Sequence, residues 1–161
     1  MSRRVSPPRP LEITSFLRPQ NIKLKLRSRD RESVLEELVA LLPLEPRPRR
    51  LLVEMLAERE TLGSTGIGKG VAIPHGRSVV INRLQIACGR SEEGIDYDAP
   101  DGKPVNLFFL IAAPPIEVGN LYHPALAKVV ELVRDQKTRN HLMNVETSEA
   151  FWEIVQGAAS P

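Results

Sequence analysis

The sequence has little cysteine, few aromatic residues and no long apolar run. Its single cysteine among 161 residues, Cys88, excludes an internal disulfide and any metal site built from several cysteines. Cys88 lies in the apolar stretch "LQIACG", so we predict that it is a small buried side chain. Aromatic residues make up only 4%, so the core must be mainly aliphatic. That scarcity also disfavours a base-stacking surface for single-stranded nucleic acid.

Membrane and targeting segments are not evident either. No run reaches the roughly 18 apolar residues of a membrane-spanning helix. The first ten residues, "MSRRVSPPRP", are rich in arginine and proline and lack the apolar segment of a signal peptide. We therefore predict a disordered basic tail over residues 1–10, no membrane span and a cytoplasmic location.

The charge balance is nearly even, with 22 basic and 20 acidic residues. Arginines gather in the tail and in "PRPRR" at 46–50. No nucleic-acid recognition motif accompanies them, so we interpret both clusters as solvated and expect no nucleic-acid partner.

Apolar periodicity predicts interleaved strands and helices. Helices are expected at 28–42, 50–60 and 124–135, with two short helices at the C-terminus, and strands at 21–26, 71–73, 83–90 and 104–113. Prolines between 43 and 48 should separate the first two helices, and Gly157 should end the last one. We predict an α/β fold over residues 11–157, a single-domain sandwich with a mixed central sheet of about five strands and helices on both faces.

The most informative stretch is "GSTGIGKGVAIPHGR" at 63–77. Its first half spells the G-x-x-x-x-G-K pattern of a phosphate-binding loop, but Gly70 replaces the hydroxyl residue that would bind Mg²⁺. The loop also follows a predicted helix and leads into the strand-like "VAIP", whereas a phosphate loop opens a helix. We therefore expect no nucleotide, metal or other cofactor.

His75 is the alternative reactive group in this stretch. Pro74 restricts the backbone before it, and we expect Gly76 to leave the ring open to another macromolecule. A neutral imidazole nitrogen is a competent nucleophile near neutral pH. An isolated histidine is more often structural, so a reactive role for His75 has to be judged from the sequence around it.

That pattern, "RETLGSTGIGKGVAIPHGR" with "GIDYDAPDGKPVNLFFLIAAP" further on, resembles the phosphotransferase-system IIA domain of the fructose/mannitol/nitrogen-regulatory type. The resemblance covers most of residues 11–157. It implies that His75 takes a phosphoryl group from a histidine-containing phosphocarrier protein. The chain would then pass the group to a IIB partner, or act as a phosphorylation-dependent regulator of nitrogen, potassium or carbon metabolism by binding a target protein.

"GSTGIG" is most like the nitrogen-regulatory branch of this family. A different class of function stays open, a non-catalytic protein-interaction module in which the phosphohistidine site is vestigial.

The resemblance also implies roles for other residues. Arg59 should lie near the phosphohistidine, where a guanidinium suits phosphoryl oxygens. Ser64, Thr65 and Gly66 should supply further donors from the loop. Lys69 stands where the family usually has asparagine, and we expect its side chain to point to solvent.

A second histidine of the family lies at the start of the helix after the central strand. Counting back from "LVRDQ" places it on Tyr122, with His123 one residue later. Pro124 favours the first helical turn, which would leave His123 just before the helix. We therefore expect His123 to face His75 and Tyr122 to pack beside the cleft, and we expect His141 to be a surface residue.

Overall fold

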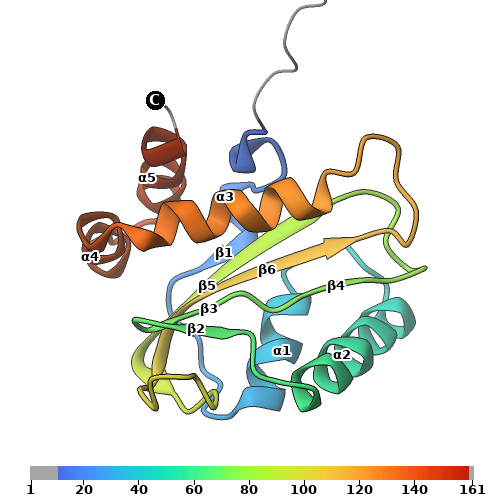
Figure 1. Cartoon of the computed structure of the whole chain (residues 1–161), viewed down its shortest axis with the longest axis horizontal. Coiled ribbons are helices and arrows are strands. Elements are labelled where there is room, and N and C mark those ends of the chain that lie inside the picture. The colour runs from blue at the N-terminus through green and yellow to red at the C-terminus, as the bar shows by residue number, and fades with distance from the viewer. Residues whose placement is uncertain (1–10, 160–161) are drawn as a thin grey trace, which may run out of the picture.

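The chain forms a mixed sheet with helices on both faces, as Figure 1 shows for this computed structural model. The structure describes residues 11–159, so the predicted basic tail at 1–10 lies outside the described residues. The strands are β1 (Ile22–Lys23), β2 (Gly66–Gly68), β3 (Val71–Ala72), β4 (His75–Arg77), β5 (Gln85–Ile95) and β6 (Val105–Ala113). The helices are α1 (Arg31–Val39), α2 (Pro46–Thr61), α3 (Tyr122–Arg134), α4 (Gln136–Asn144) and α5 (Ser148–Ala159), and two 3₁₀ turns precede them, η1 (Ile13–Ser15) and η2 (Pro19–Asn21). The predicted α/β sandwich is confirmed, with six strands in place of about five.

The long antiparallel pair β5 and β6 forms the middle of the sheet, in the order β1-β5-β6-β3-β2, with β4 also paired to β6. Alternate residues of β6 enter two separate cores because successive side chains of a strand point to opposite faces. Phe109 and Ile111 pack with α3 and α5, whereas Phe108 and Leu110 pack with α1 and α2. Cys88 is fully buried in the first core, as predicted.

Strands β3 and β4 continue one another along β6. Val71 pairs with Leu107 and His75 with Ile111, so the parallel register is the same on both sides of the break. The break falls at Ile73 and Pro74, where proline has no N–H to donate to the sheet. This interruption places His75 at the start of β4.

Several predicted boundaries were wrong. The first strand, expected at 21–26, covers only Ile22–Lys23, and the first helix, expected at 28–42, covers Arg31–Val39. Helix α2 begins at Pro46 because N–H groups of a first helical turn have no intrahelical partner, so prolines are tolerated there. Strand β5 runs through the polar "SEEG" to Ile95, which is buried and pairs with Val105. Helix α5 continues past Gly157. Among the described residues, no helix has the length and apolar character needed to cross a membrane.

Candidate functional site

His75 is the first residue of β4 and is partly buried. Its Nδ1 atom lies 2.6 Å from the carbonyl oxygen of Ile73. A carbonyl oxygen only accepts hydrogen bonds, so Nδ1 carries the proton of the neutral ring and donates it to Ile73. Nε2 therefore keeps its lone pair, which is what a nucleophilic imidazole needs.

Gly76 serves a purpose other than the one expected. It is buried, and a Cβ at this position would come within 2.5 Å of the terminal methyl carbon of Met55 on α2. Gly76 therefore faces the Met55 side chain of α2, on the side of β4 opposite to the His75 side chain, because successive residues of a strand point to opposite faces. The close packing also holds the end of α2, with Arg59, next to the strand that carries His75.

The aromatic neighbour of His75 is Tyr122. The centres of the two rings are 6.1 Å apart, and the Tyr122 ring in turn contacts the His123 ring at 5.2 Å. Helix α3 begins at Tyr122, so the expectation that His123 precedes the helix was wrong. Tyr122 shares the buried face of α3 with Ala125 and Val129, whereas His123 is exposed and lies 3.4 Å from Asn120.

Arg77 is a site residue that the sequence reasoning missed. It follows His75 by two residues on β4 and so points to the same face of the sheet. Its guanidinium carbon lies 4.5 Å from the centre of the Tyr122 ring, and its nitrogens donate to Pro114 O at 3.0 Å and Asn120 Oδ1 at 3.2 Å. The period-two spacing from His75 is the signal that would have found it.

Glu117 completes this arrangement. Its carboxylate accepts from the backbone N–H of Tyr122 at 2.8 Å and lies 3.8 Å from Arg77. The first residue of α3 is thereby tied to the strand that bears His75.

Arg59 lies in the last turn of α2, where its Nη1 donates to Gly63 O at 2.9 Å. Burial raises the pKa of Tyr122, and the positive charges of Arg77 and Arg59 oppose that rise. Two cations therefore act on the same ring that contacts His75. The tyrosine hydroxyl remains a neutral donor near neutral pH, and it has no hydrogen-bond partner within residues 11–159.

Several donors of the glycine-rich loop already have partners in the loop or next to it. Ser64 Oγ donates to Tyr97 O at 2.6 Å, and the Gly66 N–H donates to Ser64 Oγ at 3.0 Å. Both the N–H and the hydroxyl of Thr65 donate to the Glu60 carboxylate. In this conformation these donors hold the loop in shape, and direct contact of Ser64, Thr65 and Gly66 with phosphate stays a prediction.

Glu60 organises that loop and was also missed. It is only 4% exposed, and it accepts from Tyr97 Oη at 2.7 Å as well as from Thr65. A buried carboxylate needs such donors to offset its lost hydration. Burial, followed by the negative charge of Glu60, raises the pKa of Tyr97, so this phenol stays protonated and keeps donating.

Lys69 and His141 lie on the surface, as predicted. Lys69 adopts a left-handed backbone with φ of 58°, and its N–H donates to Asp101 at 2.9 Å. Asparagine tolerates this conformation better than lysine, which explains why asparagine suits this position of the loop. The glycine-rich stretch follows α2 and itself forms strand β2, which leads into β3 and not into a helix, in agreement with the argument against a phosphate-binding loop.

Comparison with known proteins identifies the scaffold around His75. Residues 15–158 match the family described as "Phosphoenolpyruvate-dependent sugar phosphotransferase system, EIIA 2". The chain belongs to this EIIA 2 family. It is 35% identical over 147 residues to the fructose-specific EIIABC component of Bacillus subtilis, with 90% of this chain but only 23% of that longer protein covered. It is 33% identical over 146 residues to a nitrogen regulatory protein of Bradyrhizobium diazoefficiens, with 90% and 95% covered.

Solved EIIA structures share the fold. The nitrogen regulatory protein IIA-Ntr of Neisseria meningitidis superposes with a TM-score of 0.77 at 34% identity, covering 89% of this chain and 98% of that one. Enzyme IIA for mannitol from Escherichia coli, solved in complex with phosphorylated enzyme IIB, superposes with a TM-score of 0.72 at 19% identity, covering 88% and 97%. The second likeness concerns the fold alone.

Proposed function

We propose that this EIIA 2 chain accepts a phosphoryl group on Nε2 of His75 from a histidine phosphocarrier protein. It then acts as a phosphorylation-dependent regulator, or relays the group to a IIB partner. The observation that supports this most is the bond from Nδ1–H of His75 to Ile73 O, which leaves Nε2 as the free nucleophile.

The transfer is in-line. The bond between phosphorus and the donor imidazole nitrogen breaks as the bond to Nε2 forms, and no proton has to leave Nε2 because it carries none. Arg59 and Arg77 offset the negative charge that arrives on a half-buried imidazole, and the Tyr122 hydroxyl donates to a phosphoryl oxygen. Positioning and electrostatics carry this kind of reaction.

The regulatory outcome is supported by the relatives called nitrogen regulatory proteins, and the relay outcome by the relative called a fructose-specific EIIABC component. Both outcomes use the same phosphorylated state and place the chain in the cytoplasm with its partners.

The test is incubation with phosphoenolpyruvate, enzyme I and a phosphocarrier protein, followed by intact-protein mass spectrometry. The wild type should gain one phosphoryl group, His75→Ala none, and His141→Ala, the exposed control, the same as the wild type. An unlabelled wild type would favour the interaction module with a vestigial site. Full labelling of His75→Ala would show that another residue is the acceptor.

A further inference from the structure

A cavity of about 420 Å³ opens at the edge of the sheet beyond β5, apart from the site around His75. Strand β1 pairs with β5 only at Cys88 and Gly89, so the first residues of β5 have no strand on that side. The segment from η1 to η2 and the chain that follows α1 form the other walls. A volume of this size is typical of sites for small organic ligands.

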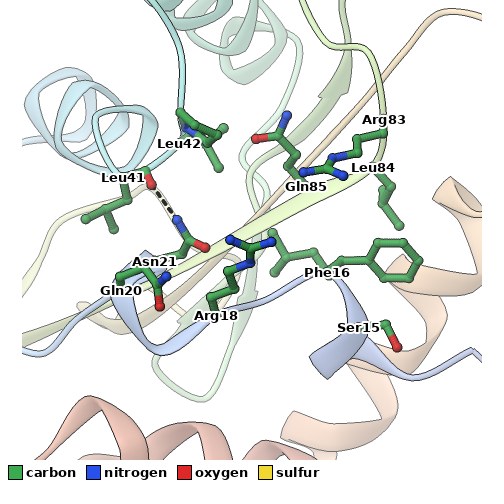
Figure 2. A pocket seen from close by; sticks show the side chains of 12 residues that line it. Ser15, Phe16, Arg18, Gln20, Asn21, Leu41, Leu42, Arg83, Leu84 and Gln85 are labelled. Carbon is green, nitrogen blue, oxygen red and sulfur yellow. Dashed lines mark hydrogen bonds between the residues drawn. The ribbon is translucent and has the colours of Figure 1, made fainter.

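The charges in this cavity are of one sign. Its lining holds two arginines, Arg18 and Arg83, and no acidic residue. Figure 2 shows both guanidinium groups directed toward the middle of the cavity from different segments. Neither has a hydrogen-bond or ion-pair partner within residues 11–159. The carbonyl oxygen of Leu41, in the wall that follows α1, accepts from the Asn21 amide at 2.6 Å.

The lining of the cavity also holds an unused acceptor. The Oε1 atom of Gln85 is buried and has no hydrogen-bond partner in the described part of the chain. A buried polar atom without a partner costs free energy, so a ligand that donates a hydrogen bond there would be favoured. The buried side chain of Leu42 adds an apolar wall.

We propose that this cavity binds a small phosphate monoester that carries a hydroxyl group. Two guanidinium groups from separate segments suit a tetrahedral phosphate, which offers several oxygens in different directions, whereas one guanidinium already matches both oxygens of a carboxylate. The hydroxyl group donates to Gln85 Oε1, and the carbon chain lies against Leu42.

The strand register places this site close to His75 but separate from it. Ile86 in the cavity wall pairs with Ile111, which pairs with His75 on its other side. Two strand spacings, roughly 10 Å, therefore separate the two backbones. A ligand bound beyond β5 does not touch His75, so its binding does not depend on the phosphotransfer proposed above.

The experiment titrates the full chain with sn-glycerol 3-phosphate and follows the side-chain amide of Gln85 and the backbone amide of Ile86 by ¹H–¹⁵N NMR. Both signals should shift in a saturable manner. Inorganic phosphate and glycerol, which each carry only part of the ligand, should bind at least about tenfold more weakly, as should succinate, a dicarboxylate.

Variants locate the site. Arg18→Gln combined with Arg83→Gln should weaken binding about tenfold or more, because two charge-assisted contacts are lost. Arg47→Gln, a matched change of an exposed arginine outside the cavity, and His75→Ala should both bind as the wild type does. Thermal unfolding of each variant verifies that it is folded.

Three results would overturn the proposal: no saturable shift at Gln85, unchanged affinity in the folded double variant, or loss of binding in His75→Ala. The last would place the phosphate at the His75 site. Affinity for inorganic phosphate or succinate equal to that for the ester would overturn the assignment of the ligand class.

Discussion

The Nδ1 atom of His75 lies 2.6 Å from the carbonyl oxygen of Ile73, two residues earlier in the chain. Pro74, between them, has a fixed φ and no N–H, but its carbonyl oxygen still accepts from the Ile111 N–H of β6 at 3.0 Å. Ile73 turns its backbone groups to the opposite side, where its N–H donates to Thr65 O at 3.0 Å. The Ile73 carbonyl on that side is available to the ring, so the proton is held on Nδ1 and Nε2 is left free to react.

The first prediction concerns the tautomer of His75. Long-range ¹H–¹⁵N correlation spectra near neutral pH should show the proton on Nδ1 and a free lone pair on Nε2, because Ile73 O can only accept. After phosphotransfer, the phosphorus should be attached to Nε2. A dominant Nε2–H tautomer, or phosphate on Nδ1, would contradict the assignment.

The second prediction concerns Arg59. Arg59→Ala should slow phosphotransfer to His75 about tenfold to a hundredfold, since a hydrogen bond to a charged group contributes about 1.5–3 kcal/mol. Arg59→Lys should recover part of the rate, because it restores the charge but not the planar fork. Phosphotransfer reactions quenched at a series of times give the rates, and thermal unfolding verifies that each variant is folded.

Arg47→Ala is the matched control, since this exposed arginine lies in the first turn of the same helix. It should transfer at the wild-type rate. If Arg59→Ala also did so, Arg59 would only cap the helix end through Gly63 O.

The sequence predicted the layers of the fold and singled out His75, because apolar periodicity and the "AIPHG" pattern are local signals, but it did not predict strand β4, which His75 begins. It did not predict that α2 begins at Pro46, since helix starts tolerate the prolines that usually break helices. Nor did it show that Glu60 and Tyr97 join the loop from positions 37 residues apart. Such buried polar contacts depend on tertiary packing, which no spacing along the chain reveals.

The third prediction concerns acid stability. Burial opposes the ionisation of Glu37, but hydrogen bonds from Lys23, Ser28 and the backbone of Arg27 and Ser28 outweigh it and lower the pKa from 4.5 to about 2. A carboxyl with a lowered pKa stabilises the folded state above its unfolded pKa, and this contribution is lost as the pH falls toward the folded pKa. The free energy of unfolding should therefore decrease by about 1–3 kcal/mol between pH 4.5 and 2 on account of this group.

Glu37→Gln should have a lower free energy of unfolding than the wild type at pH 7, and this free energy should fall less steeply between pH 4.5 and 2. Urea unfolding at a series of pH values measures both effects. Glu93→Gln is the control, because its ion pair with Arg29 is solvent-exposed on both sides and such pairs contribute little. Equal effects of the two variants would show that the Glu37 cluster has no special role.

The last prediction separates Tyr122 from His123. Neighbouring residues of a helix point about 100° apart, so only one of them can share the buried face of α3. Tyr122 does so, at 8% exposure and in ring contact with His75, whereas His123 is exposed.

Tyr122→Phe keeps the ring and removes only the hydroxyl, so phosphotransfer should slow by about fivefold to tenfold, the effect of one lost hydrogen bond of about 1 kcal/mol. His123→Ala should stay within about twofold of the wild type, because its ring contacts Tyr122 and not His75. The measurement is the phosphotransfer rate of each variant, and thermal unfolding verifies that each is folded. If His123→Ala slowed transfer more than Tyr122→Phe, His123 would be the residue that supports His75, as the sequence analysis expected.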